Sequence, residues 1–332
     1  MATLKDVARL ANVDVSTVSR ALNNTSYVHP DTKKKIMDAV QQLSYKPNLL
    51  AKGLRQGKRR TIGVVVPSLN LSVFGDIVQS VEKMARDLGY AVMICTTQDD
   101  PDTEEECLNR LRNGLVDGIL IASTGQNKRL LRSIHADGIA VAQMVRRQDN
   151  QISSAVADYF SSAFQGVKFL YKKGSRYIGL INGSTEIIPY RERYRGYKKA
   201  VRDCRCEENT VESSLPKGDY FKDGYEGALA LLRQCPETDG ILVAVDMQGL
   251  GALRALKDRG IKVPKQVRVL SLTGNSIGTK LETTMSSLEM PAEEIGRKVT
   301  QMIIEEIEAS PDSKPSQQHI VFDVQIAERE TT

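Results

Sequence analysis

The first 45 residues alternate apolar stripes with polar faces at helical spacing. Apolar residues at i, i+3, i+4 and i+7 predict a short helix over residues 4–10. Thr3 and Asp6 have the spacing of a capping box, with Asp in place of the usual Glu or Gln. A second helix is predicted from position 14 or 15 to position 23, and a third over about residues 30–43. Two short helices joined by a tight turn, followed by a third, form the helix-turn-helix plan.

The next segment, residues 47–60, looks like a basic linker but carries leucines. Leu50, Ala51 and Leu54 are spaced to form one apolar face over two helical turns. A helix of about eight residues is marginal in water on its own, and Gly53 destabilises it by about 1 kcal/mol more. We therefore predict a hinge helix that forms only when something pairs with it.

From position 61 the pattern changes to short β-branched runs that alternate with helical stretches. Near-continuous apolar runs indicate buried parallel strands, and their alternation with helices predicts doubly wound parallel sheets in two similar halves. The strands are expected at residues 61–67, 89–95, 118–122, 140–143, 155–158, 177–181, 240–244 and 268–272. Further strands are expected near 320–328, beginning with residues 319–322, and would cross back toward the first half. The helices are expected at residues 74–88, 103–113, 127–136, 192–204 and 248–259, with a further one that ends at 171.

Charge divides the chain in the same place as the hydrophobic pattern. Residues 1–61 hold twelve Lys and Arg against four Asp, so they carry +8, and the rest carries −3 because the whole chain is +5. A basic head on a mildly acidic body favours a nucleic-acid contact confined to the head. The alternative is a solvated basic surface, which would give the same charge distribution. The beginning MATLKDVARL lacks the apolar core of a signal peptide, no apolar run approaches a membrane span, and five cysteines make no disulfide framework. We expect a soluble, cytoplasmic protein.

The outward face of the second predicted helix carries hydrogen-bonding groups of the kind that meet base edges. Ser16, Thr17, Ser19 and Asn23 can donate or accept, and Arg20 could pair bidentately with a guanine. The alternative is a three-helix bundle without a ligand.

Residues 2–8 (ATLKDVA) and 15–23 (VSTVSRALN) resemble the lactose-repressor/galactose-repressor family of bacterial transcription regulators. The resemblance implies that Val15, Ser16 and Arg20 read bases, and that Leu54 is a wedge in the minor groove with Lys52 beside it. Packing of Leu54 on the body is the alternative. The full set of expected DNA-binding residues is Thr3, Val15, Ser16, Thr17, Ser19, Arg20, Asn23, Lys52, Leu54 and Arg55.

The same resemblance implies a periplasmic-binding-protein-like α/β body of two lobes with a ligand between them. The domains are then 1–46 (helix-turn-helix), 47–60 (hinge) and 61–332 (effector binding and dimerisation). The lobes would cover about 61–158 plus 291–318 and 163–286 plus 326–332, with crossovers near 158–163, 286–292 and 318–326.

Open α/β sheets bind ligands at the carboxyl ends of their strands, and the family places its effector there. Residues 193–197 resemble the family's R-x-x-G-aromatic element, and residues 218–220 resemble its G-D-aromatic element. The expected effector-binding residues are Leu71, Val73, Phe74, Thr124, Gln143, Arg146, Arg191, Arg193, Tyr220, Asp246 and Thr273.

Departures from the family pattern shift this pocket positive. Residues 271–275 (SLTGN) stand where the family often has Gly-Tyr/Phe-Asp, and Gln143-Met144 stands where another strand end often carries Asp. With two carboxylates lost and Arg146, Arg191 and Arg193 kept, we expect, within the broad class of carbohydrates and acidic sugar derivatives, an acidic effector such as a sugar phosphate or a sugar acid rather than a neutral sugar. The alternative is that these arginines pair locally with Glu192 or Asp149, or stay solvated.

The expected function is that of a homodimeric, effector-responsive repressor of operator DNA, with dimer contacts from the helices at 74–88 and 248–259. Cys204 and Cys206 are too close in sequence for a zinc pair, and we find no catalytic cluster, so neither cofactor, metal nor enzymatic activity is expected. The end of the chain lacks a leucine heptad, which favours a dimer over a tetramer. The alternatives are a catabolite-control regulator with a phosphoprotein corepressor, a sugar-binding transport protein, and a sugar-processing enzyme.

Overall fold

The computed structural model describes residues 2–23, 26–45, 59–213, 219–274, 277–310, 313 and 315–332. Its contacts divide the chain into Met1–Arg59, here called the head, and Arg60–Thr332, the body. The predicted hinge helix, with Lys52, Leu54 and Arg55, lies outside the described residues.

The head is built from the helices α1 (Leu4–Ala11), α2 (Val15–Asn23) and α3 (Pro30–Gln42). The predicted capping box is confirmed, because the Thr3 hydroxyl accepts from the amide of Asp6 at 3.3 Å and the Thr3 amide donates to the Asp6 carboxylate at 2.9 Å. Val7, Val18 and Ile36, one from each helix, are fully buried together in the core of the head. The apolar stripes predicted from the sequence therefore face one another.

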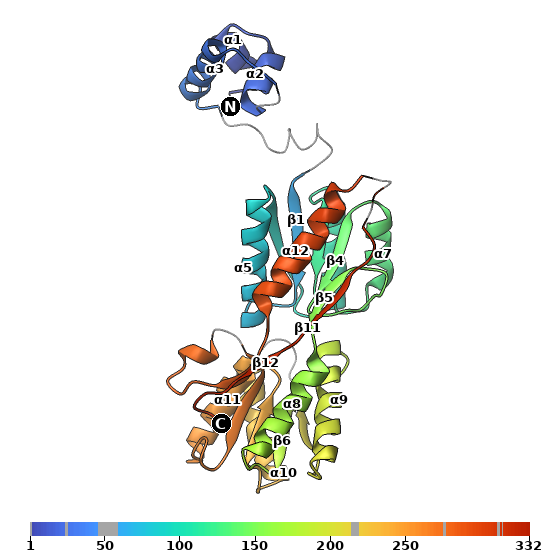
Figure 1. Ribbon diagram of the computed structural model, residues 1–332, viewed down its shortest axis with the longest axis vertical. Helices are drawn as coiled ribbons and strands as arrows, with labels where there is room; N and C mark the ends of the chain where they lie inside the picture. Colours follow the sequence, from blue (N-terminus) through green and yellow to red (C-terminus); the bar gives the residue numbers. More distant parts are fainter. Residues whose placement is uncertain are drawn as a thin grey trace. The chain divides into compact units, whose positions relative to one another are not determined.

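The first lobe of the body is a six-stranded sheet in the order β11-β5-β4-β3-β1-β2, with all neighbouring strands parallel. Its strands are β1 (Thr61–Val66), β2 (Ala91–Thr96), β3 (Gly118–Ile121), β4 (Ala140–Met144), β5 (Ser154–Ala157) and β11 (His319–Phe322). Helices α5 (Ser72–Asp87) and α12 (Ala292–Glu308) lie side by side on one face (Figure 1). Helices α6 (Pro101–Arg112) and α7 (Lys128–Ala136) pack on the other face, over Val65, Ile119 and Val141. Burial on both faces is why the central strands β1, β3, β4 and β5 read as continuous apolar runs, whereas the edge strands β2 and β11 are partly exposed.

The second lobe repeats this plan with the strand order β12-β10-β9-β8-β6-β7. Its strands are β6 (Ile178–Asn182), β7 (Asn209–Glu212), β8 (Gly240–Val243), β9 (Arg268–Gly274), β10 (Ser286–Glu289) and β12 (Gln325–Ala327). Helices α8 (Tyr159–Lys172) and α9 (Ile188–Asp203) pack together on one face, and α10 (Tyr220–Gln234) and α11 (Asp246–Asp258) pack together on the other. A short 3₁₀ turn, η1 (Gly278–Lys280), follows β9.

The chain passes from one lobe to the other after β5, after β10 and after β11 (Figure 1). Asp158 caps α8 directly after the first passage, by accepting from the Ser161 amide at 2.9 Å. β12 runs antiparallel to β10, a departure from the all-parallel sheets expected. The lobes are thus joined by short connections beside the cleft that separates their sheets.

Several elements differ from the sequence expectations. β7, β10, α10 and α12 were not among the predicted elements. β7 is only partly buried, β10 (SSLE) is short and largely polar, and α10 contains two glycines, whereas α12 has a helical pattern of buried residues that the expected elements did not include. Helix α9 begins four residues earlier than expected because Pro189 occupies its first turn, where proline is tolerated.

Candidate nucleic-acid interface and inter-lobe cleft

The exposed face of α2 is held in place from both sides of the helix. Val18 and Ala21 are buried in the core of the head and fix the rotation of the helix. At the start of α2, the Asp14 carboxylate accepts from the Ser16 amide at 2.7 Å, and hydrogen bonds from Ser16 lower the pKa of Asp14. The buried residues fix how α2 is rotated about its axis, and Asp14 fixes where it begins. The polar side of α2 therefore faces solvent.

Ser16 and Arg20 stand on that polar side, one turn apart. Both are exposed, and the Arg20 guanidinium donates to Ser16 Oγ at 2.9 Å and to the Ser16 carbonyl at 3.3 Å. Thr17 and Ser19 are partly exposed beside them. Arg20 is thus a cation whose hydrogen-bond partner is neutral, and a base or phosphate can replace that partner.

The other predicted contacts of the head have different environments. Val15 is half-buried against the core of the head, and the Thr3 hydroxyl is engaged with Asp6 at 2.7 Å. Asn23 ends α2, and its side chain lies outside the described residues.

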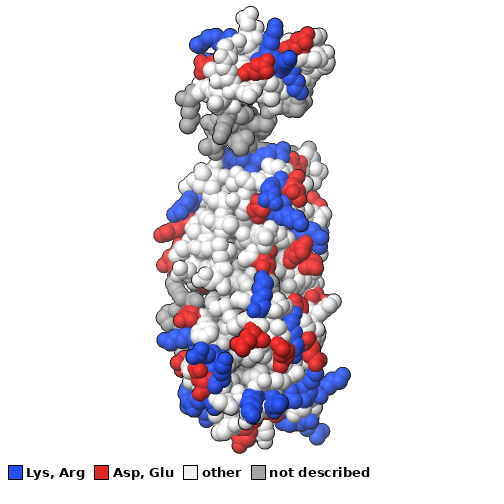
Figure 2. Space-filling model, turned by 90° about the vertical axis from the view of Figure 1, so that its left-hand side faces the viewer, with Lys and Arg blue, Asp and Glu red and all other residues white. Residues whose placement is uncertain are grey.

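The positive charge of the first 61 residues is concentrated after the head helices. Six of its twelve Lys and Arg lie at positions 46–60, where there is no acidic residue. On the face of the head seen in Figure 2, Lys and Arg side chains stand beside Asp side chains. The head helices therefore offer hydrogen-bonding groups, while the following segment supplies most of the charge that phosphates attract.

In the body, the carboxyl ends of the strands meet at the cleft between the lobes. The side chains that line it are Leu71, Val73, Phe74, Val145, Arg146, Tyr159, Ile187, Pro189, Tyr190, Arg193, Val245, Thr273 and Met290. The free volume is about 30 Å³, room for about one water molecule. The cleft is therefore closed on its own side chains, and its walls must part to admit a ligand.

Two buried arginines face this cleft from opposite lobes. Arg146, at the end of β4, pairs through both terminal nitrogens with the carboxylate of Asp99. Burial by itself lowers the pKa of Arg146, but the charge and hydrogen bonds of Asp99 outweigh burial and raise it. Arg193, on α9, donates to the Thr273 hydroxyl, and burial lowers its pKa.

Three tyrosines surround these arginines. The Tyr159 ring lies 4.8 Å from the Arg193 guanidinium carbon, and the Tyr190 ring lies 5.8 Å from it. Burial raises the pKa of Tyr159 to about 12, and it raises the pKa of Tyr190 and Tyr220 as well. The hydroxyls therefore stay protonated at neutral pH. The aromatic rings pack against the Arg193 guanidinium, but they supply no negative charge to balance it.

The structure brings together most, but not all, of the predicted effector-binding residues. Leu71, Val73, Phe74, Arg146, Arg193 and Thr273 line the cleft, and Tyr220 adjoins it through its hydrogen bond with Tyr190. The tyrosines at positions 159 and 190 were missed; the signal was an aromatic residue in the first turn of a helix that follows a strand end.

Thr124, Gln143, Arg191 and Asp246 do not line the cleft. Thr124 bonds to Glu104 at 2.7 and 3.0 Å, and Gln143 bonds to the loop after β4, donating to the Asp149 carbonyl at 2.7 Å. Asp246 is buried in the first turn of α11.

Arg191 lies half-exposed over a separate groove and stands 4.0 Å from Glu192. The alternative, in which Asp149 is a local partner of one of these arginines, does not hold, since Arg146 pairs with Asp99 and Asp149 pairs with Arg132. Both pairings join residues far apart in sequence.

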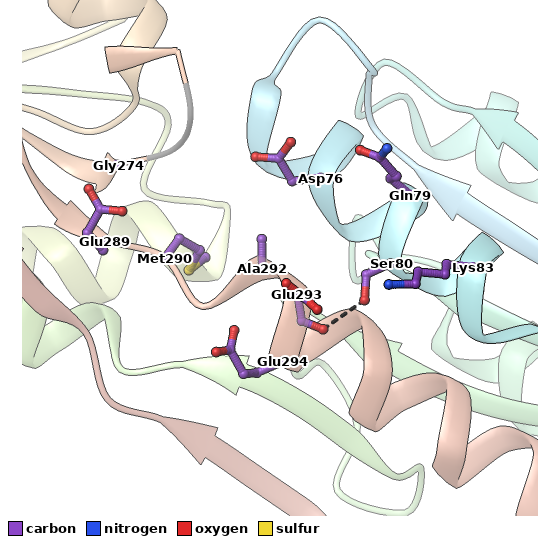
Figure 3. A pocket seen from close by; sticks show the side chains of 10 residues that line it. All are labelled: Asp76, Gln79, Ser80, Lys83, Gly274, Glu289, Met290, Ala292, Glu293 and Glu294. Carbon is purple, nitrogen blue, oxygen red and sulfur yellow. Dashed lines mark hydrogen bonds between the residues drawn. The ribbon is translucent and has the colours of Figure 1, made fainter. Parts of the chain in front are cut away.

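A larger cavity of about 450 Å³ opens elsewhere between the lobes, beside α5 and the start of α12 (Figure 3). Beside it, where α5 meets the start of α12, the Ser80 hydroxyl donates to the Glu293 carbonyl at 2.8 Å. Asp76, Glu289, Glu293 and Glu294 outnumber Lys83 in its lining, so its charge does not suit an anion.

Within the described ranges, no group of three or more His, Cys, Asp and Glu is placed to hold a metal ion. None of the helices that the structure describes has the length and apolar character needed to cross a membrane.

Comparisons with known proteins match both parts of the chain. A model described as bacterial regulatory proteins, lacI family, matches residues 3–48, and one described as periplasmic binding proteins and sugar binding domain of LacI family matches residues 59–326. The HTH-type transcriptional regulator RegA of Clostridium acetobutylicum is 31% identical over 99% of this chain and 99% of its own. Catabolite control protein A of Priestia megaterium is 29% identical over 89% of each chain. A lac repressor dimer bound to operator and the anti-inducer ONPF shares the fold, with a TM-score of 0.85 at 22% identity over 99% of this chain and 98% of that one.

Proposed function

This chain belongs to the LacI family of bacterial regulatory proteins, and we propose that it is a homodimeric repressor whose affinity for operator DNA is set by a small molecule bound between its two lobes. In this proposal α2 of each copy enters a major groove, and the segment 47–60 reaches the adjacent minor groove. The proposed DNA contacts are Thr3, Val15, Ser16, Thr17, Ser19, Arg20, Asn23, Lys52, Leu54 and Arg55.

The exposed polar face of α2 is the observation that carries the DNA-binding proposal. A helix enters a major groove of about 12 Å when its outward side chains are short, with a few donors that reach base edges. Ser16, Thr17 and Ser19 are short, and Arg20 is an exposed donor whose present partner is a neutral hydroxyl. Exchanging that partner for a guanine edge costs little.

A second copy is proposed to cover the outer edge of the first lobe. β2 lies at the end of its sheet, contains no charged residue, and exposes 44% of Ile94. An uncharged edge strand is open to pairing or packing with another chain, and Figure 2 shows a broad area of the first lobe with few charged side chains. Helix α5 is packed behind this strand and completes the proposed interface.

The effector is proposed to act by holding the lobes in one relative position. Arg146, Val73 and Phe74 belong to the first lobe, whereas Arg193 and Thr273 belong to the second, so one ligand can contact both. A change in that relative position would move the first lobes of the dimer and so set the separation of the two hinge segments. This is a coupling between two sites through one element that has two states.

The test is Arg20→Ala in the full chain, on a duplex enriched from random-sequence DNA by the unaltered protein. Loss of a bidentate base contact costs about 1–3 kcal/mol, or about 5- to 150-fold in affinity. Arg20 is exposed, so the head keeps its fold. Fluorescence anisotropy at one fixed salt concentration measures the change.

Lys34→Ala is the matched control, because it removes one exposed cation from α3. It should weaken enriched and random duplexes alike, and only slightly. An equal loss in both variants, on both duplexes, would show that α2 does not read sequence.

The match to catabolite control protein A supports a second candidate, in which a phosphoprotein corepressor replaces or assists the small molecule. A pull-down from cell extract with and without sugar phosphate separates the two. A sugar-binding transport protein is less well supported, because residues 3–48 match the family model of the lacI-family bacterial regulatory proteins. RegA is a transcriptional regulator, and for this chain we propose no enzymatic activity.

A further inference from the structure

Arg193 is a buried cation whose charge no described residue balances. Only 3% of it is exposed, and the charged or ionisable groups that act on it are the phenols of Tyr159 and Tyr190. Within the described part of the chain, no carboxylate forms an ion pair with it, whereas Arg146 has Asp99. A buried charge is costly unless it is paired, so this position calls for an anion from elsewhere.

Arg193 also has an unused donor. Its Nε has no hydrogen-bond partner among the described residues, and the same is true of Arg146 Nε across the cleft. Buried donors are nearly always satisfied in native proteins. Two guanidinium N–H groups from opposite lobes therefore lack an acceptor.

The other polar groups of the cleft are already committed. The Thr273 hydroxyl donates to the Ala244 carbonyl at 2.7 Å while it accepts from Arg193. The Tyr159 hydroxyl donates to the Val145 carbonyl at 2.8 Å, and Tyr190 is hydrogen-bonded to Tyr220. The hydrogen-bonding groups that the lining still offers to a ligand are therefore mainly donors.

The rest of the lining is apolar. It consists of Leu71, Val73, Phe74, Val145, Val245 and Met290, with Ile187 and Pro189 at the start of α9. Each hydroxyl of a sugar would need an acceptor or a water on burial, and an unpaired hydroxyl costs about 1–3 kcal/mol. These walls suit a hydrocarbon surface better than a polyhydroxylated one.

We propose that the effector of this chain is a small organic acid with an apolar body, whose carboxylate pairs with Arg193 and whose aromatic or branched aliphatic part packs against the apolar walls. The proposal rests on the proposed function, because it names the class of the effector that the inter-lobe cleft binds. Val145, Val245 and Thr273, at the strand ends, are what make the cleft selective against neutral sugars.

Isothermal titration of the full chain tests the class. The probes are benzoate, phenylacetate and 4-methylpentanoate, each with its amide, beside glucose, ribose, cellobiose, glucose 6-phosphate and inorganic phosphate. A charge-assisted hydrogen bond is about twice as strong as a neutral one, so at least one acid should bind about tenfold or more tighter than its amide. Thermal shift at matched concentrations gives a second reading, since a ligand of the folded state raises Tm.

Arg193→Gln should abolish the preference for acid over amide, and Arg193→Lys should keep part of it because the charge remains. Arg191→Gln is the matched control: it removes a guanidinium two residues away on the same helix, but from a half-exposed side chain outside the cleft. It should change acid affinity by no more than about twofold, as exposed charges contribute little.

Three outcomes would overturn the proposal. The first is that a neutral sugar or the sugar phosphate binds more tightly than every acid. The second is that inorganic phosphate binds as tightly as the best acid. The third is that no acid in the panel binds. Operator binding is measured on the same preparations. If the chain binds its operator specifically and a sugar is its ligand, the organic-acid proposal fails while the proposed repressor function stands. If the chain shows no sequence-specific DNA binding at all, the proposed function itself fails.

Discussion

At the scale of single residues, neighbouring arginines have different roles because their partners differ. Arg146 is held by Asp99, 47 positions earlier in the chain, and is part of the framework of the first lobe. Arg193 has aromatic rings and a hydroxyl around it but no carboxylate among the described residues. Arg191 is half-exposed near Glu192. Of the three, only Arg193 combines burial with an unbalanced charge, which is why we assign it the ligand.

Also at this scale, the start of α2 makes a prediction about pH. Hydrogen bonds from Ser16 lower the pKa of Asp14 below its ordinary 3.8 in the folded head. A group with a depressed folded-state pKa stabilises the fold above its unfolded pKa, and that stability is lost as the pH falls through the folded value. The Ser16 amide shift, followed by NMR, should therefore titrate with a midpoint below 3.8.

Asp14→Ala removes this titration, and the head of the variant should lose less stability in acid. A midpoint at or above the ordinary value in the unaltered protein would show that the bond at 2.7 Å to the Ser16 amide is not kept in solution.

At the scale of elements, the second lobe depends on helices that touch backbone to backbone. A Cβ at Gly251 of α11 would lie 1.9 Å from the Phe221 carbonyl oxygen of α10, and one at Gly224 of α10 would lie 1.9 Å from the Gln248 carbonyl oxygen. Each helix thus supplies the glycine that lets the other approach. Any larger residue must push the two helices apart.

We therefore expect Gly251→Ala to lower the free energy of unfolding of the second lobe by about 1–3 kcal/mol or more, as overpacking does. Gly75→Ala in α5 is the matched control, since a Cβ there meets nothing within 4 Å. It should raise stability by up to about 1 kcal/mol through helix propensity. Urea unfolding measures both, and similar midpoints would contradict the close approach of α10 and α11.

At the scale of the whole molecule, the coupling between effector and operator has to pass through residues 47–60, of which positions up to 58 lie outside the described residues. The apolar face of Leu50, Ala51 and Leu54 is too short to fold alone. It is proposed to form against its twin and the minor groove, where an apolar wedge unstacks a base step and bends the duplex.

Leu54→Ala should therefore reduce both operator affinity and bend angle, while the affinity for the effector stays unchanged. Circular-permutation gel shift gives the bend, and isothermal titration gives effector binding. Unaltered affinity and bend in the variant would return Leu54 to the role of a linker residue.

Local patterns predicted much of the fold, because they report on contacts a few residues apart. The capping box of α1, the core stripes of the head helices and most of the buried strands, such as β1, could be located this way, whereas the serine-rich β10 could not. The motifs at residues 2–8 and 15–23 pointed to the family for the same reason. A helical period or a run of β-branched residues can be recognised from neighbouring positions in the sequence alone.

Tertiary structure alone decided which side chains at the strand ends meet in the cleft. Gln143 and Thr124 turn to the loop after β4 and to Glu104, whereas Tyr159 and Tyr190 turn inward around Arg193. No spacing predicts that Asp99 balances Arg146 while Arg193 is left without a carboxylate in the described part of the chain. Such pairings join distant parts of the chain, and only the packing of two lobes brings those parts within reach of one another.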